Sequence, residues 1–506
     1  MSSSDTKTIS TRLGITKYQF FCVMAASIPS VNFGWNFVVT NLPGDIITRC
    51  LAGPKHNING LPSCIPTSDI IWGVAVGSYA IGALIGAILC TRFSNQYGRK
   101  FVILYSNIIG LVSALLLGLS VNIPMFVCSR IVAGIAQGAA NGTFSTYVVE
   151  ITTPRARNSL SCVIQLAVST GVMLGFVCSL GMLKLPLWRV LFALTGALCL
   201  LSILSVSFCV ESPKWLAMKD KHELAQNALQ RLRKDADITE EYEQIVMAVK
   251  PDCSKSDAGK YTASVLDVIL GKTPDNLYHQ LLVSVMGMFF QQATGISGIS
   301  FFSTSLFNGL SPPKETRDVS KPTLAQFLSV VVSFVGVIFT LIGMLLTSYM
   351  GRRAMMFLSH GLMAVFCVLM SIGDIYHMPF LAISSVFIFY GVYYFGAGPI
   401  PWVIPNEITP TYAVSAVMAI TNSVGYLGIF TISLVFSPIL SALNGYGFLV
   451  FATANILAVV FFYFFLPETR NRTNLELVRV HSVGIHNVLR AKYKTFSSET
   501  TLNNWD

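Results

Sequence analysis

Charged residues are scarce in this chain. Asp, Glu, Lys and Arg make up 11% of its 506 residues, against 53% that are hydrophobic, and the mean hydropathy is +0.63. A soluble domain cannot hide so much apolar area, whereas membrane-spanning helices of roughly 20 apolar residues each use it naturally. The composition therefore excludes a soluble multidomain protein, a collagen, a coiled coil and a disordered chain, and it predicts a membrane protein.

Motifs of catalysis and metal binding are also missing. The sequence has no nucleophile elbow, phosphate-binding loop or HExxH segment, and its 11 cysteines form no CxxC or Cys/His ligand spacing. Residues 1–17 lack the apolar core and cleavage site of a signal peptide. We therefore expect neither an enzyme nor a bound metal or cofactor, and no cleaved leader.

Twelve apolar segments are present, in two sets of six. They span residues 18–40, 69–93, 101–121, 124–149, 159–181 and 189–209, then 279–308, 324–349, 353–373, 379–404, 412–438 and 446–466. The long polar connection between the sets has apolar residues at helical spacing, which predicts short amphipathic helices. The predicted organisation of this all-α membrane protein is an N-terminal tail (1–17), a six-helix bundle (18–210), a linker (211–278), a second bundle (279–466) and a C-terminal tail (467–506).

The net charge of +10 is spread over the ends of the apolar segments. The basic residues of alternate connections are Arg92, Arg99, Lys100, Arg155, Arg157, Arg352, Arg353, Arg470 and Arg472. Loops with this excess of Lys and Arg are typically cytoplasmic, so both termini are expected in the cytoplasm. The positive charge thus reflects the orientation of the chain in the membrane. We therefore expect the protein to contact the lipid bilayer and not to bind nucleic acid.

The first loop on the opposite side contains Cys50 and Cys64. These two cysteines would pair if the loop faces an oxidising compartment and would stay thiols otherwise. The loop has no N-glycosylation acceptor, so the sequence leaves open whether the membrane is the plasma membrane or an internal one such as that of a vacuole.

Three short segments recur at an offset of about half the chain. Residues 96–100 (QYGRK) match 349–353 (YMGRR), Glu150-Ile-Thr-Thr-Pro matches Glu407-Ile-Thr-Pro, and Glu211-Ser-Pro matches Glu468-Thr-Arg. Each pair follows the second, fourth or sixth apolar segment of its half. A nearly constant offset predicts a duplicated six-helix unit. Two such repeats are the architecture of a rocking carrier that binds its substrate between the halves near the membrane midplane.

The recurring segments carry charges of both signs. They are Arg99, Lys100, Glu150, Arg157 and Glu211 in the first half, and Arg352, Arg353, Glu407 and Glu468 in the second. Oppositely charged groups can bridge neighbouring helices while one face of a carrier is shut and separate when that face opens. The charges therefore predict a cytoplasmic gate, with simple anchoring of the helix ends as the alternative.

Amide side chains within the apolar segments are costly unless they have partners. The amides in question are those of Asn36, Gln165, Gln291, Gln292 and Asn422. Amides donate and accept hydrogen bonds, as sugar hydroxyls do, so these residues predict a binding site for a neutral polyhydroxy ligand. Trp402 offers an apolar face for a sugar ring. Hydrogen bonding between helices is the alternative role for each amide.

The motifs also carry a family resemblance. They are the two Gly-Arg-Lys/Arg loops, Arg130 with Gly134, Glu150 through Arg157, Glu211-Ser-Pro-Lys-Trp, residues 291–298 (QQATGISG), 398–402 (GPIPW) and Pro467-Glu-Thr. In this order they resemble the sugar porters of the major facilitator superfamily, close to the facilitative hexose transporters. The resemblance implies a monomeric alternating-access carrier of a hexose or related polyol, with sugar contacts at Gln165, Gln291, Gln292 and Trp402.

The tenth segment contains the helix breakers Gly396, Gly398, Pro399 and Pro401. They predict a bend in this helix that serves as a hinge of the moving gate, with a static kink as the alternative.

Coupling can be argued from Asn36. Proton-linked sugar porters resemble this chain but carry an aspartate where Asn36 stands, and an amide does not titrate in this way. This difference favours facilitated diffusion over proton symport.

Several positions depart from the family pattern. Ser297, which we include in the binding site, stands where an asparagine is usual; the others are Phe301, Phe302, Gly336, Ser348, Tyr394 and Val414. Most of these departures remove a hydrogen-bonding or charged group. They indicate either a carrier of a different or less hydroxylated ligand or a carrier-like sensor or adaptor that does not transport.

Overall fold

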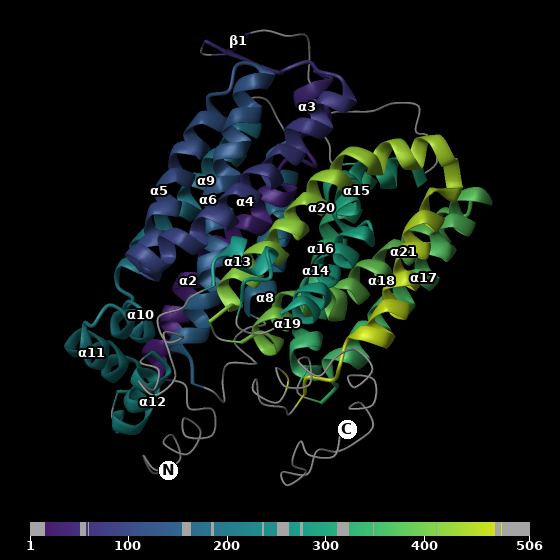
Figure 1. Ribbon diagram of the computed structural model, residues 1–506. Helices are drawn as coiled ribbons and strands as arrows, with labels where there is room; N and C mark the ends of the chain where they lie inside the picture. Colours follow the sequence, from purple (N-terminus) through teal and green to yellow (C-terminus); the bar gives the residue numbers. More distant parts are fainter. Residues whose placement is uncertain are drawn as a thin grey trace, which may run out of the picture.

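The computed structural model describes residues 16–50, 57–58, 60–153, 163–183, 187–234, 237–249, 263–273, 277–310, 323–347, 349–410, 412–470 and 477. Within these residues the chain is nearly all helical, with one short antiparallel hairpin of β1 (Asn57–Ile58) and β2 (Leu61–Pro62). Two helix bundles stand side by side, with α20 crossing between them (Figure 1). The predicted all-α membrane fold is thus confirmed.

Each bundle consists of six membrane-spanning segments. The first contains α2 (Lys17–Val38), α4 (Asp69–Tyr97), α5 (Arg99–Gly118), α6 (Ile123–Ile151), α8 (Val163–Gly181) and α9 (Trp188–Ser207). The second contains α14 (Tyr278–Ala293) with α15 (Ile296–Leu310), α16 (Leu324–Leu346), α17 (Arg352–Ile375), α18 (Pro379–Val392) with η2 (Tyr393–Ala397) and α19 (Ile400–Ile408), α20 (Val414–Leu443) and α21 (Gly447–Phe465).

Eleven helical stretches of the described chain are long and apolar enough to cross a membrane, and the last of them has 52 residues. That stretch is more than twice the length that one crossing needs. It contains α20 and α21, which the turn η3 (Asn444–Tyr446) separates and which run in opposite directions in Figure 1. The chain is therefore a multi-pass membrane protein with twelve spans, as its hydropathy predicts.

Local sequence explains where several of these helices begin. Four helices begin after a residue whose side chain accepts a hydrogen bond from the backbone N–H three residues later. These caps are Thr16 for α2, Ser68 for α4, Asn122 for α6 and Thr323 for α16.

Small residues set the packing distance between helices within a bundle. A Cβ on Gly82 would overlap the carbonyl of Ile131, so α4 and α6 approach each other backbone to backbone.

The seventh segment differs from the prediction of one continuous helix over 279–308. The helix is interrupted between α14 and α15, where Gly295 adopts a φ of +84°. Glycine takes this left-handed conformation without a steric cost, so the apolar run alone does not reveal the break. The interruption places Gln291 and Gln292 at the end of one helix and Ser297 at the start of the next.

The linker consists of two parts attached to different bundles. Its helices α10 (Pro213–Met218), α11 (His222–Arg233) and α12 (Thr239–Val249) pack on the first bundle, where Thr16 Oγ1 donates to the Leu232 carbonyl (2.7 Å). The short helix α13 (Val265–Ile269) packs on α20 instead, and the Ala263 N–H donates to the Tyr412 carbonyl (3.1 Å). We call the face of the molecule that carries α10–α12 the linker side.

The opposite face, which we call the disulfide side, carries α3 (Gly44–Thr48) and the hairpin. Cys50 and Cys64 form a disulfide with Cα atoms 5.4 Å apart. The loop before α4 is also fixed to α9, because Trp188 Nε1 donates to the Ser63 carbonyl (3.0 Å) and Arg189 Nη2 to the Pro62 carbonyl (2.8 Å). Of the two alternatives that the sequence leaves open for these cysteines, the structure has the paired one.

Replacing Cys64 by serine is expected to lower the free energy of unfolding by about 3 kcal/mol, because the disulfide closes a loop of about 15 residues. The two cysteines are separated by 14 positions in the sequence. Thermal unfolding of the purified protein measures the effect. The matched control is Cys128→Ser, which removes an exposed free thiol and should leave the melting temperature unchanged. Equal melting temperatures for Cys64→Ser and the wild type would contradict the prediction.

Candidate substrate site and charge clusters

The two bundles are joined tightly on the disulfide side. The rings of Phe37 and Phe301 lie 4.4 Å apart between centroids, and Asn41 Nδ2 donates to the Ser300 carbonyl (2.6 Å). Gly77 of α4 lets α20 approach, because a Cβ there would overlap the Ser433 hydroxyl. The two bundles are thus in direct contact on the disulfide side.

Three of the predicted binding residues form one hydrogen-bonded chain in the second bundle. Ser297 Oγ donates to Gln292 Oε1 (2.5 Å), and Gln292 Nε2 donates to Gln291 Oε1 (3.1 Å). Gln291 Nε2 in turn donates to the carbonyls of Ala397 (3.2 Å) and Gly398 (2.7 Å). All three side chains are buried. The amide chain is therefore attached directly to the irregular part of the tenth span.

That part of the tenth span is the predicted bend. The π-helical turn η2 replaces α-helix over Tyr393–Ala397, and the Gly398 N–H donates to the Tyr393 carbonyl five residues back (2.8 Å). The helix resumes as α19 after Pro399. Single π turns inside α-helices frequently occur at functional sites. The sequence thus correctly predicts where this helix loses regular geometry; its role as a hinge stays a prediction.

Gln165 brings the first bundle to the same place. A Cβ on Gly398 would lie 3.5 Å from Gln165 Nε2, so the amide of α8 faces the end of η2 across the two halves. Within the described part of the chain, the Gln165 side chain makes no hydrogen bond, which leaves its amide available to a ligand. Trp402 lies one turn beyond Gly398 and packs against the hydrophobic core cluster that includes Phe33, Tyr79 and Tyr426.

Asn36 and Asn422 have different surroundings from these amides. Asn36 Nδ2 donates within its own helix to the carbonyl (2.9 Å) and Oδ1 (2.8 Å) of Asn32, while Arg130 Nη1 donates to the Asn36 carbonyl (2.9 Å). Asn422 lines a cavity nearer the linker side. The structure therefore brings Gln165, Gln291, Gln292 and Ser297 together around the bend and places the two asparagines outside this group.

Two departures from the family pattern compensate each other. A Cβ on Gly336 would lie 2.9 Å from Tyr390 Cε1 and 3.2 Å from Tyr394 Cδ2, so the Tyr394 ring fills the space beside Gly336. The hydroxyls of Tyr390 and Tyr394 are 3.3 Å apart. Phe301 and Phe302 likewise make ring contacts, with Phe37 and Phe436. The aromatic residues at these positions thus pack against neighbouring rings of the bundles.

In the first bundle the predicted gate charges form a cluster on the linker side. Arg99 donates to both oxygens of Glu150 through Nε (2.8 Å) and Nη2 (2.9 Å). The Glu211 carboxylate accepts hydrogen bonds from the backbone N–H groups of Arg99 (3.0 Å) and Lys100 (3.1 Å) at the start of α5. A negative charge at this position stabilises the helix, because the N-terminal end of a helix carries a partial positive charge. Burial raises the pKa of the Glu211 carboxyl above its ordinary value, although these N–H groups act in the opposite direction.

The second bundle repeats this arrangement. Arg352 Nη2 donates to Glu407 Oε1 (2.9 Å), and Glu468 Oε1 accepts the Arg352 backbone N–H (2.9 Å). The basic residue that follows each of these arginines binds a backbone carbonyl near the end of the sixth span of its bundle. Lys100 Nζ donates to the Ser207 carbonyl (2.8 Å), and Arg353 Nη2 donates to the Tyr463 carbonyl (3.1 Å). Arg157 lies outside the described residues, as does Ser348.

The predicted charges therefore come together, but each half of the duplicated sequence forms its own cluster. The ion pairs of Arg99 with Glu150, Arg233 with Glu241 and Arg352 with Glu407 each join residues of one bundle and its attached linker helices. Such clusters hold the helix ends of one bundle together. Whether they also act as a gate stays a prediction.

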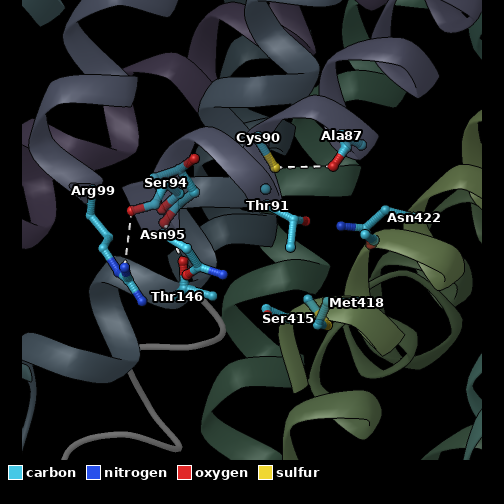
Figure 2. A pocket seen from close by; sticks show the side chains of 13 residues that line it. Ala87, Cys90, Thr91, Ser94, Asn95, Arg99, Thr146, Ser415, Met418 and Asn422 are labelled. Carbon is cyan, nitrogen blue, oxygen red and sulfur yellow. Dashed lines mark hydrogen bonds between the residues drawn. The ribbon is translucent and has the colours of Figure 1, made fainter. Parts of the chain in front are cut away.

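A cavity of about 30 Å³ opens between the bundles on the linker side. It lies between α4, α6 and α20, and Figure 2 shows Thr91 and Asn422 facing each other across it. Sequence reasoning missed its hydroxyl residues, because Ser and Thr within a helix usually satisfy themselves on a nearby carbonyl and give no signal of a site. Among the described residues no group of three or more His, Cys, Asp or Glu is placed to hold a metal ion.

Twelve spans in two matching bundles, closed on one side and hollowed between them on the other, define a membrane transporter of the major facilitator type. The chain belongs to the sugar (and other) transporter family, whose model matches residues 21–480. This family consists of transporters and not enzymes.

Curated relatives extend over most of the chain. Solute carrier family 2, facilitated glucose transporter member 3 of the dog (Canis lupus familiaris) is 28% identical over 480 residues and covers 92% of each chain. Member 5 of the same family from the horse (Equus caballus) is 25% identical over 466 residues, with 90% of each chain covered.

Solved structures share the fold. The proton:xylose symporter XylE bound to 6-bromo-6-deoxy-D-glucose matches with a TM-score of 0.74 at 21% identity, covering 91% of this chain and 98% of that one. The inward open conformation of the xylose transporter XylE from E. coli has a TM-score of 0.70 at 20% identity, covering 92% and 100%.

Proposed function

We propose that this protein carries a hexose or a related polyol across its membrane by alternating access and facilitated diffusion. The observation that carries the proposal is the convergence of Gln165 from one bundle with Gln291, Gln292 and Ser297 from the other at the bend of the tenth span. Amides from both halves can bind the two sides of one neutral polyhydroxy ligand, so closing either side around it requires the bundles to move.

The proposal that transport is not coupled to protons is argued first from the first span. Asn36 is buried beside Arg130, and neither side chain supplies a carboxylate that could carry a proton. Glu150 and Glu407 are held in ion pairs at helix ends. These contacts support a carrier without proton coupling, and the proposal takes this carrier to work as a monomer. The positive-inside pattern supports a cytoplasmic linker side and cytoplasmic termini, with η2 as the hinge and the charge clusters as the gate.

Uptake of a panel of labelled hexoses into liposomes that contain the purified protein tests the proposal, with and without an imposed pH gradient. Saturable uptake that equilibrates and ignores the gradient is the expected result, because no described acidic group is placed to couple proton movement to the sugar. Empty liposomes provide the control for leakage. Accumulation driven by the gradient would replace facilitated diffusion by symport, and an absence of transport in folded protein would favour another ligand or a sensor.

A further inference from the structure

The cavity between α4, α6 and α20 has a chemistry of its own. Its polar walls come from Thr91, Ser94, Thr143 and Thr146 of the first bundle and from Ser415 and Asn422 of the second. We propose that this cavity is a second sugar subsite, which a neutral polyol occupies between the central site and the linker-side solution. This inference rests on the proposed function and adds a second binding site for the same substrate along its route through the protein.

The position of the cavity separates it from the central site. Gln292 packs against α20 at Gly428, where a Cβ would lie 2.7 Å from Gln292 Cβ. Asn422 precedes Gly428 by six residues, which is about 9 Å along a helix. Between these levels, Tyr426 contacts Phe33 of the other bundle with ring centroids 5.9 Å apart. A sugar moving from Gln292 toward the linker side therefore passes the aromatic pair and meets Asn422 next.

Unsatisfied polar atoms at the cavity indicate an occupant. Asn422 is 3% exposed, and neither its Oδ1 nor Thr143 Oγ1 has a hydrogen-bond partner within the described chain. Buried polar atoms without partners are costly, so a hydroxylated ligand or water is expected to bind them. Figure 2 shows the amide nitrogen of Asn422 directed toward Thr91, so groups from both bundles face one space.

The electrostatics of the cavity favour a neutral ligand. Arg99 reaches its rim, but this guanidinium is already bound to Glu150 and, through Nη1, to the Ser94 carbonyl (3.0 Å). The remaining polar lining consists of hydroxyl and amide groups, which cannot balance a bound anion or cation. At about 30 Å³ the cavity admits only water-sized groups in this conformation. Because the bundles are joined at Gly77 on the disulfide side, separation on the linker side widens it.

Isosteric removal of its hydroxyls tests the proposal. In Thr91→Val and Thr146→Val, the KM for sugar presented from the linker side is expected to rise at least threefold, while the KM from the disulfide side stays unchanged. Sided zero-trans entry and exit measurements provide both values. Thr91→Ser should restore the wild-type KM, because it returns the hydroxyl. The matched control is Thr453→Val on the exposed face of α21, where Oγ1 bonds to its own helix.

Cys90 provides a second readout because its thiol borders the cavity. Sugar should slow maleimide labelling of Cys90, followed by mass spectrometry, and should do so even in Gln291→Ala protein, whose central site is impaired. Cys128 of α6, a free thiol that is not part of the cavity lining, serves as the internal control, and its labelling rate should be the same with and without sugar. Equal KM changes on both sides, or no change and no protection of Cys90, would show that only water fills the cavity. That result leaves wild-type transport intact and is thus distinct from failure of the proposed function, in which no sugar is transported at all.

Discussion

Gln291→Ala is expected to reduce the rate of sugar uptake at least tenfold. The Gln291 amide donates to the carbonyls of Ala397 and Gly398 and accepts from Gln292 Nε2 (3.1 Å). Losing a buried hydrogen-bonding group costs about 1–3 kcal/mol for each partner left unsatisfied, and 1.4 kcal/mol already corresponds to a factor of ten. The variant loses the proposed ligand contact and the connection between the amide chain and the bend.

Gln165→Ala separates these two effects. Since Gln165 has no hydrogen-bond partner within the described chain, its removal should raise the KM without changing the melting temperature, whereas Gln291→Ala should also lower the melting temperature. Initial uptake rates per reconstituted protein and thermal unfolding measure both quantities. Gln226→Ala on the exposed face of α11 is the control and should behave as the wild type. Normal uptake by Gln291→Ala would remove this residue from the site.

Glu407→Gln is expected to destabilise the second bundle by about 3–5 kcal/mol, which is the usual cost of leaving one partner of a buried ion pair alone. The side chains of Arg352 and Glu407 are only 5% and 14% exposed, and their atoms Nη2 and Oε1 lie 2.9 Å apart. Removing the carboxylate charge leaves the Arg352 guanidinium buried without its counter-ion. The measurement is the melting temperature together with the monodisperse fraction after purification.

The double variant Arg352→Met/Glu407→Leu distinguishes an uncompensated charge from a loss of packing. It should recover most of the stability that Glu407→Gln loses, because apolar pairs of similar volume often replace buried ion pairs without a penalty. Asp220→Asn, which removes a carboxylate from an exposed pair with His222 (3.9 Å), should leave the melting temperature unchanged. A Glu407→Gln protein as stable as the wild type would show that Arg352 does not depend on this carboxylate.

The fold was predictable because its main signals are local or periodic. Apolar length gives the spans, and the repeated charge motifs give the duplication. The break at Gly295 was not predictable from hydropathy, because an apolar run does not encode a positive φ. The clusters of Arg99 and Arg352 show a similar limit: the sequence identifies the charges but not which helix ends lie next to them.

The candidate site was predicted in part for the same reason. Gln165, Gln291, Gln292 and Ser297 meet at a bend whose glycines and prolines are visible in the sequence. Asn422 has the same chemistry, yet its place on α20 puts it in the cavity on the linker side. The relation between Gly336 and Tyr394 depends on contact between α16 and the tenth span, which no spacing along the chain reveals.

The self-contained charge clusters have a consequence for biosynthesis. In the first bundle, the ion pairs of Arg99 with Glu150 and of Arg233 with Glu241 can form once residue 241 has left the ribosome. These pairs contain no residue of the second bundle. The first bundle can therefore reach a stable state in the membrane while the rest of the chain is still being translated. The second bundle then assembles its own pair of Arg352 with Glu407 and docks on the first through contacts such as that of Asn41 with the Ser300 carbonyl.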